Sequence, residues 1–137
     1  MRIVLDTNVL VSAVLSPLGL PAQVLELVLN RTVTLLVSHA ILKEYKEVLH
    51  RKEFSFPDRS IDQLLRVIDL TAEKISVVPS SLKLPDPDDL PFLDCAIQGK
   101  AGALVTGNKK DYPISVCGDA RTVSPVEFLR LLDESQK

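Results

Sequence analysis

The stretch Ile3-Val4-Leu5-Asp6-Thr7-Asn8 decides the fold that this sequence predicts. The apolar run at 3–5 has the length of a strand, and such a run is typical of the centre of a parallel sheet, where both faces are covered. Asp6 then stands at the carboxyl end of that strand, where open α/β sheets bind their ligands. A carboxylate between two buried elements is costly unless something compensates its charge, and a metal ion is a frequent partner.

The rest of the chain alternates between patterns typical of strands and of helices. We expect strands at residues 3–5, 32–37, 74–78 and 103–106, a weaker edge strand within 116–123, and helices at residues 7–15, 22–30, 39–50, 61–71, 91–100 and 125–132. Ser38 is a predicted N-cap, and Ser124 with Glu127 forms a predicted capping box. Residues 51–59 are a polar connection that contains Phe54 and Phe56. This alternation predicts a single α/β domain over residues 1–137, with a parallel sheet and right-handed crossovers.

Composition narrows the class of protein. With 137 residues, 46% hydrophobic and 25% charged, the chain is expected to be globular rather than disordered. A net charge of −2 argues against a broad basic surface for nucleic acid, although an acidic site neutralised by a cation could still contact phosphates. No uncharged apolar stretch reaches about 18 residues, and no signal peptide is recognisable, so we expect a cytoplasmic protein without a membrane span. For Cys95 and Cys117, reduced buried thiols are favoured over a disulfide.

Oxygen-bearing side chains follow the predicted strands at the carboxyl edge of the sheet. They are Asp6, the pair Asp88-Asp89, Asn108 with Asp111, and Glu44 on the helix after the second strand. Carboxylates crowded into one cleft repel each other, and a hard divalent cation relieves that repulsion. A set without His or Cys fits Mg²⁺ or Mn²⁺. Such a site activates water for in-line attack on a phosphodiester.

Each of these residues also has an ordinary structural alternative. Asp88 or Asp89 could cap the following helix, Glu44 could be an exposed helix residue, and Asp111 could be a loop acid. Asp94 lies off the apolar stripe of its helix, so periodicity makes it a flank residue. The remaining polar candidates could be tolerated helix-start residues or solvated surface, namely Asn8, Ser12, Lys109 and Lys110.

The motifs resemble those of a known family. Asp6-Thr7-Asn8-Val9-Leu10-Val11-Ser12 resembles the opening motif of PIN domains, the fold of VapC-type ribonuclease toxins. Asp86-Pro87-Asp88-Asp89, followed by Phe92-Leu93-Asp94-Cys95-Ala96, is similar to the third motif of one subfamily, the toxin components often called PIN family 3. Two further stretches are similar to that subfamily, Leu104-Val105-Thr106-Gly107-Asn108 and Val123-Ser124-Pro125-Val126-Glu127-Phe128-Leu129. The resemblance covers nearly the whole chain.

The resemblance implies roles for individual residues. It makes Asp6, Glu44, Asp89 and Asp94 the catalytic acids, with Asp6 and Asp89 also binding the metal. The fourth motif departs from the pattern, since many members have Asp where this chain has Asn108. Its amide offers an oxygen ligand without charge, so a second metal would bind more weakly, or Asp111 would take its place. Three residues would support this site, namely Asn8, Ser12 and Thr106, and Lys109 and Lys110 would bind substrate.

The resemblance also implies a fold, an activity and partners. The implied fold has three layers, α/β/α, around a mainly parallel sheet. The implied function is Mg²⁺- or Mn²⁺-dependent cleavage of single-stranded RNA by the toxin of a toxin–antitoxin pair, with homodimers and an antitoxin as partners. An alternative is a PIN-like module that has lost its chemistry and binds nucleic acid or protein, which Asn108 favours. A phosphatase with Asp6 as nucleophile is disfavoured, because such enzymes have a second Asp where this chain has Asn8.

Overall fold

The central sheet has five strands, all paired in parallel, and the computed structural model describes residues 1–135 of the chain. Their order across the sheet is β3-β2-β1-β4-β5. The bounds are β1 (Arg2–Leu5), β2 (Thr34–Val37), β3 (Glu73–Lys74), β4 (Ala103–Val105) and β5 (Thr122–Val123). Because β1 pairs with β2 on one side and β4 on the other, it lies at the centre, as its apolar run predicts.

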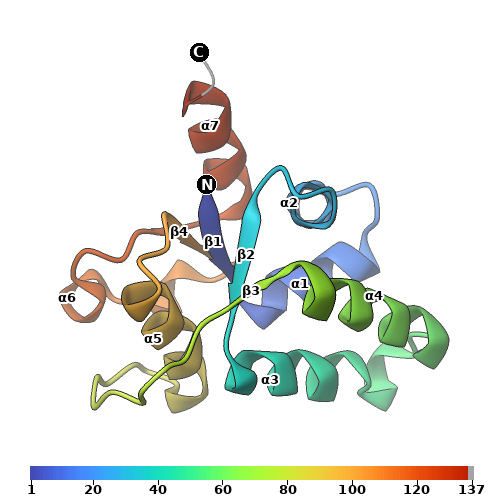
Figure 1. Cartoon of the computed structure of the whole chain (residues 1–137), viewed down its shortest axis with the longest axis horizontal. Helices are drawn as coiled ribbons and strands as arrows, with labels where there is room; N and C mark the ends of the chain where they lie inside the picture. The colour runs from blue at the N-terminus through green and yellow to red at the C-terminus, as the bar shows by residue number, and fades with distance from the viewer. Residues whose placement is uncertain (136–137) are drawn as a thin grey trace.

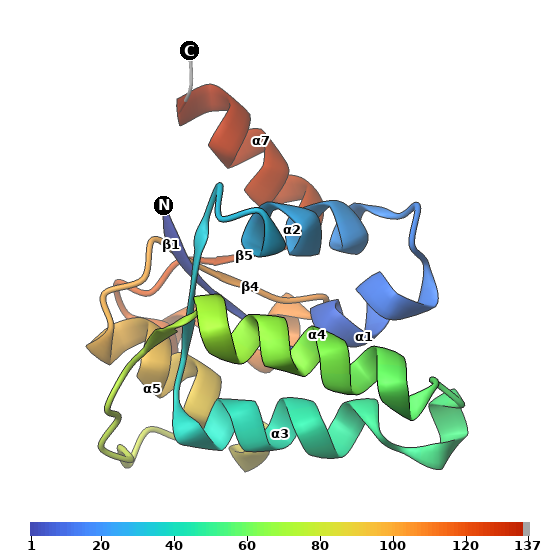
Figure 2. The same cartoon turned by 45° about the vertical axis from the view of Figure 1, so that its right-hand side comes forward.

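Helices cover both faces of this sheet. They are α1 (Thr7–Leu15), α2 (Leu20–Leu29), α3 (His39–Leu49), α4 (Asp58–Thr71), α5 (Leu90–Gln98), α6 (Ile114–Cys117) and α7 (Pro125–Ser135). Three short 3₁₀ turns, η1 (Lys52–Phe54), η2 (Pro87–Asp89) and η3 (Lys109–Asp111), lie in the connections. Figures 1 and 2 show α5 on one side of the sheet and α1, α2 and α4 on the other. The expected three-layer α/β/α fold is confirmed.

The core forms around the central strand β1. Ile3, Val4 and Leu5 are fully buried, which is the result expected for a strand covered on both faces. On α3, Ile41, Tyr45 and Leu49 follow helical spacing and are buried where α3 packs against α1, α4 and α5. The Tyr45 hydroxyl donates a 2.6 Å hydrogen bond to the carbonyl of Leu5. This bond fixes α3 against the last residue of β1, immediately before Asp6.

Local signals place several helix ends correctly. The helix expected at residues 7–15 is α1 as observed, and Ser38 Oγ accepts a 3.2 Å hydrogen bond from the Ile41 amide as a true N-cap. The capping box also forms: Glu127 Oε1 accepts from the Ser124 amide at 2.9 Å, and Ser124 Oγ accepts from the Glu127 amide at 3.2 Å. Both cysteines are free and buried, as expected.

The two weakest strand predictions need correction. The strand expected at residues 74–78 has only Glu73 and Lys74 in the ladder, because its partner β2 ends at Val37, which pairs with Lys74. Further along, the Gln98 side chain binds the Val78 amide at 2.9 Å and the Val78 carbonyl at 2.7 Å. The edge strand expected within 116–123, around Gly118, is present only at residues 122–123 as β5, because residues 114–117 form α6. Gly118, with φ of +58°, ends α6 in a conformation that glycine adopts at little cost.

Within the described residues, no single helix has the length and apolar character to cross a bilayer; only α1 and α2 taken together do, with a bend of 106° between them.

Candidate functional site

Asp6 is held at the carboxyl edge of the sheet by both of its neighbouring strands. It follows β1 directly, and its amide donates a 2.9 Å hydrogen bond to the carbonyl of Val105 at the end of β4. The side chain is only 4% exposed, and its Oδ2 accepts hydrogen bonds of 2.9 Å from the hydroxyls of Thr106 and Tyr112. Burial raises the pKa of Asp6, and these two hydrogen bonds partly offset that rise. Asp6 is therefore a fixed, poorly solvated carboxyl.

Two further acids share a cavity with Asp6. Glu44 comes from α3 and Asp89 from the start of α5, and with Asp6 they line a cavity of about 420 Å³. Its other lining residues are Thr7, Asn8, Val11, Ser12, Val48, Arg51, Phe54, Asp86 and Asp88. The structure thus brings together three acids that are remote in sequence, because the carboxyl ends of β1 and its neighbours meet at one edge.

Glu44 is oriented by the first turn of α1. The Thr7 hydroxyl donates a hydrogen bond to Glu44 Oε2, which ties α3 to the residue that follows Asp6. Burial raises the pKa of Glu44, the Thr7 hydrogen bond lowers it, and the charges of Asp6 and Asp88 raise it further. A helix position at the border of the apolar stripe therefore reaches the cavity and is not a solvated surface glutamate.

Asp89 is the most strongly perturbed acid of the cavity. Burial, together with the negative charges of Asp6, Asp86 and Asp111, raises the pKa of Asp89 from 3.8 to about 7. The expectation that Asp88 or Asp89 caps the following helix is wrong. Asp86 instead caps the short turn η2 that precedes this helix, since its Oδ1 accepts a 2.9 Å hydrogen bond from the Asp88 amide. Asp89 makes no capping bond and stays available to the cavity.

The donor set of this cavity fits a hard cation in its chemistry. Carboxylate, amide and hydroxyl oxygens line it, and the three raised pKa values reflect negative charge that burial leaves uncompensated. Across residues 1–135, however, no three carboxylate, His or Cys side chains are arranged to hold a metal ion as they stand. Asp6 is locked by its hydrogen bonds, so the side chains of Glu44 and Asp89 would have to turn toward it.

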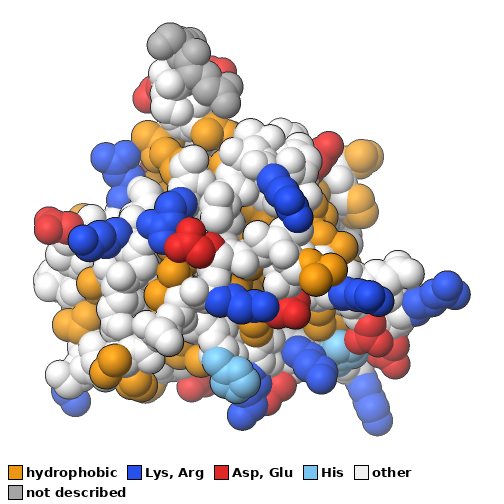
Figure 3. Space-filling model, viewed as in Figure 1, with side chains coloured by type: hydrophobic (Ala, Val, Ile, Leu, Met, Phe, Trp, Pro, Cys, Tyr) orange, Lys and Arg blue, Asp and Glu red, His pale blue; other side chains and the backbone are white. Residues whose placement is uncertain are grey.

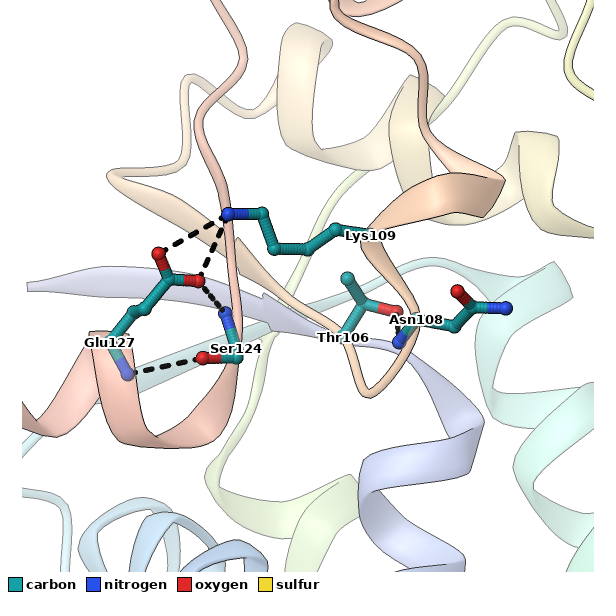
Figure 4. A network of polar contacts seen from close by, with 5 residues as sticks. All are labelled: Thr106, Asn108, Lys109, Ser124 and Glu127. Carbon is teal, nitrogen blue, oxygen red and sulfur yellow. Dashed lines mark hydrogen bonds and ion pairs between the residues drawn. The ribbon is translucent and has the colours of Figure 1, made fainter.

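The fourth motif is organised by Thr106, which is fully buried. Its Oγ1 donates to Asp6 Oδ2 and accepts a 3.1 Å hydrogen bond from the Asn108 amide. Figure 4 shows the Asn108 side chain directed away from Thr106, and its Nδ2 donates to Asp111 Oδ1 at 3.2 Å. Asn8 connects α1 to this segment, because its Oδ1 accepts a hydrogen bond from the Gly107 amide at 2.9 Å. Asn108 and Asp111 therefore pair with each other beside the cavity and do not line it.

The two predicted substrate-binding lysines differ in their surroundings. Lys109 Nζ lies 3.1 Å and 3.2 Å from the two carboxylate oxygens of Glu127, so its charge is directed toward α7 (Figure 4). Lys110 is exposed and has no ion-pair partner among residues 1–135. On the face in Figure 3, basic and acidic side chains are interspersed and form no broad basic surface, in keeping with the net charge of −2.

Asp94 lies apart from the other predicted acids. It is 3% exposed, and its carboxylate accepts hydrogen bonds from the Ser80 amide at 3.1 Å and the Ser80 hydroxyl at 2.6 Å. It lines a second cavity, of about 510 Å³, together with Ser38 and His39. Its observed contacts therefore tie α5 to the irregular chain that precedes Asp86.

Sequence reasoning missed four residues of the site. Thr7 and Tyr112 bind its acids, and Arg51 and Phe54 line its cavity. Helical spacing does not mark Arg51, because it lies beyond α3 with extended backbone, immediately before η1. No local pattern marks Tyr112, which reaches Asp6 only through the folding of the chain.

Comparisons with known proteins found a matching family model, a relative and a solved structure of similar fold. A family model described as PIN domain matches residues 2–110. An uncharacterized protein of Methanocaldococcus jannaschii, MJ1680, is 28% identical over 111 residues, which are 79% of this chain and 71% of that protein. A chain in the crystal structure of VapBC2 from Rickettsia felis, bound to a DNA fragment from their promoter, superposes with a TM-score of 0.61. That match covers 90% of this chain and 98% of the other at 20% identity, so it shows a shared fold.

Proposed function

The chain belongs to the PIN domain family, whose members are generally nucleases, and from this premise we propose that it is a metal-dependent endoribonuclease acting on single-stranded RNA. One observation carries the proposal. Asp6, Glu44 and Asp89 converge on one cavity, and burial raises the pKa of each, with neighbouring acids adding to the rise for Glu44 and Asp89. Mg²⁺ or Mn²⁺ is the proposed cofactor, since both prefer oxygen ligands.

Different residues of the cavity have different proposed roles. Asp6, Glu44 and Asp89 would hold the cation, which when bound polarises the phosphodiester and activates water. Thr106 and Tyr112 fix the Asp6 carboxylate, so this ligand needs little reorganisation, whereas Glu44, which Thr7 holds in the unliganded protein, and Asp89 would turn toward it. Asn8 and Ser12 line the cavity beside them, while Asn108 and Asp111 lie next to it. Lys110 and Lys109 are proposed to meet the phosphates of the substrate.

Asp94 has a different proposed role. Its carboxylate is occupied by Ser80 and lines another cavity, so we assign it the positioning of α5 and thereby of Asp89 at the start of that helix.

The biological context is proposed from fold likeness. The VapBC2 structure from Rickettsia felis has a chain of the same fold, which supports a toxin that is blocked by an antitoxin protein. We further propose that the protein is cytoplasmic and forms homodimers. Co-expression with the product of an adjacent small reading frame tests the partner, because an antitoxin should relieve growth inhibition that Asp6→Asn alone also relieves.

Cleavage of single-stranded RNA with Mg²⁺ or Mn²⁺ tests the activity. Asp6→Asn and Asp89→Asn should each lower the rate by at least about a hundredfold, as expected when a group that stabilises the transition state is lost. Glu44→Gln should also lower the rate. Its matched control is Glu47→Gln, one turn along α3 and outside the cavity, which should cleave like wild type. Unchanged cleavage in both Asp variants would reject the proposal.

A second candidate is a binding module without catalysis, and Asn108 favours it. The family motif commonly has Asp at this position, and here the amide is paired with Asp111. Titration of Mn²⁺ into the metal-free protein separates the two candidates. Absence of binding at millimolar Mn²⁺, together with retained RNA binding, would establish the module.

A further inference from the structure

The acidic cavity has a second end with different chemistry. Its acids lie toward Asp6, whereas Val48, Arg51 and Phe54 line the part formed by the end of α3 and the following turn η1. Glu44 and Val48 lie one turn apart on α3, and Arg51 follows two residues after the end of that helix, immediately before η1. One wall therefore changes along its length from a carboxylate, through an apolar side chain, to a guanidinium and an aromatic ring.

The Phe54 ring is held in place by its neighbour. Phe54 and Phe56 stack with their ring centroids 5.4 Å apart and their planes 12° apart. Phe56 packs against the hydrophobic core, whereas Phe54 is half-buried and lines the cavity. Ser55 between them has φ of +53°, in the left-handed region, and ends η1. The ring of Phe54 is thus positioned before any ligand arrives, which reduces the entropy that binding costs.

Arg51 supplies the positive charge at this end. It is exposed, and within residues 1–135 no carboxylate lies within ion-pair distance of it. It lines the same cavity as Glu44, so its charge lies along the path that leads to the acids. A guanidinium offers five donors in a fixed plane and pairs well with phosphate oxygens.

We propose that Arg51 and Phe54 form a nucleotide-binding subsite, in which Phe54 stacks on an unpaired base and Arg51 binds a phosphate adjacent to the one at the acids. The inference rests on the proposed nuclease function and names the part of the substrate that the site recognises. Aromatic stacking beside a cation is how proteins bind single strands without reading sequence. Bases inside a duplex are stacked on each other, so the subsite favours single-stranded over double-stranded substrate.

A tryptophan reporter tests stacking directly, because the chain contains no tryptophan. Phe54→Trp places a single indole in the subsite, and Leu70→Trp places one on α4, where Leu70 is 70% exposed and outside the cavity. Both variants carry Asp89→Asn to prevent cleavage, and short oligoadenylate with Mg²⁺ is the probe. Saturable quenching at position 54 alone supports the proposal, and an abasic strand of equal length should not quench. Equal quenching at both positions, or none at position 54 while the strand binds by fluorescence anisotropy, overturns it.

Kinetics separate the subsite from the chemistry. Phe54→Leu should raise the KM for single-stranded RNA about tenfold or more and leave kcat nearly unchanged, whereas Phe54→Tyr should keep the wild-type KM. Arg51→Gln should raise KM and reduce the slope of log affinity against log salt by about 0.7, the contribution of one phosphate contact on a single strand. Lys52→Gln, the neighbouring exposed cation outside the cavity, is the matched control.

Different results reject the proposed nuclease function and the proposed nucleotide-binding subsite. If wild-type protein cuts RNA and Phe54→Leu and Arg51→Gln behave like Lys52→Gln, the subsite is rejected and the nuclease stands. If no RNA is cut and oligoadenylate still quenches Phe54→Trp, the nuclease is rejected and the subsite stands as a binding site. If the protein neither cuts nor binds RNA, both are rejected.

Discussion

The hydroxyl of Tyr112 donates a 2.9 Å hydrogen bond to Oδ2 of Asp6, and the two residues lie 106 positions apart in the chain. Thr106 donates to the same oxygen at 2.9 Å. The central carboxyl of the cavity is therefore oriented by residues that follow β4, although it belongs to the end of β1.

Tyr112→Phe should destabilise the protein by about 1–3 kcal/mol, the cost expected when a buried charged group loses a hydrogen bond. The loss should be larger at pH 8 than at low pH, because the lost bond favours the ionised form of Asp6, whose pKa burial already raises. Urea unfolding at several pH values measures this. Tyr45→Phe is the control: its hydroxyl donates to a backbone carbonyl, so its cost should not follow the titration of Asp6.

Asp89→Asn should stabilise the metal-free protein at pH 8. Because the fold raises the pKa of Asp89 from 3.8 to about 7, its carboxyl contributes favourably only while protonated. That contribution is complete below pH 3.8 and is lost as pH rises through about 7. The gain from the substitution should therefore shrink toward pH 4. Thermal unfolding with and without Mg²⁺ checks it, since Mg²⁺ should raise the Tm of wild type more than that of the variant.

Glu47→Gln serves as the control for that measurement, because Glu47 is exposed on α3 and outside the cavity. If the Tm of Asp89→Asn equals that of Glu47→Gln at every pH, the fold does not raise the pKa of Asp89.

Asn108→Asp should strengthen Mn²⁺ binding and weaken the metal-free fold. The substitution removes the hydrogen bond that Asn108 Nδ2 donates to Asp111 and places two carboxylates side by side. A bound cation relieves this repulsion, so calorimetric titration should show a tighter Kd together with a lower Tm before metal is added. An unchanged Kd would mean that position 108 does not reach the cation.

Asp94→Ala should cost about 1–3 kcal/mol of stability, because it removes both hydrogen bonds between this buried side chain and half-buried Ser80. Ser80→Ala removes one of the two bonds and should cost less. The fraction that remains folded should retain metal binding when measured below the Tm of each variant. Normal stability with abolished cleavage would instead make Asp94 a catalytic group.

The sequence predicted those parts of the molecule that local patterns determine. The apolar run of β1, the bounds of α1 and the caps at Ser38 and Ser124 follow from spacing and side-chain chemistry within a few residues. The meeting of Asp6, Glu44 and Asp89 follows from the topology of a parallel sheet, in which strand ends share an edge.

The remaining features depend on contacts that no local pattern encodes. Three acids within Asp86-Pro87-Asp88-Asp89 are equivalent by spacing, and only the turn geometry makes Asp86 the cap and leaves Asp89 to the cavity. Asp94 looks like a flank residue until the irregular chain brings Ser80 over it. Lys109 pairs with Glu127 because β5 and α7 follow next to β4, which brings the capping glutamate within reach.

The pairing of Gln98 with Val78 has a consequence for how copies of this protein meet. The exposed border of a sheet is a template on which another molecule can add its own strand. Beyond β3, the border strand, the carboxamide of Gln98 occupies both the donor and the acceptor of Val78. At Val78 a neighbouring chain therefore finds no free main-chain pair, and a single side chain blocks strand addition past the end of β3.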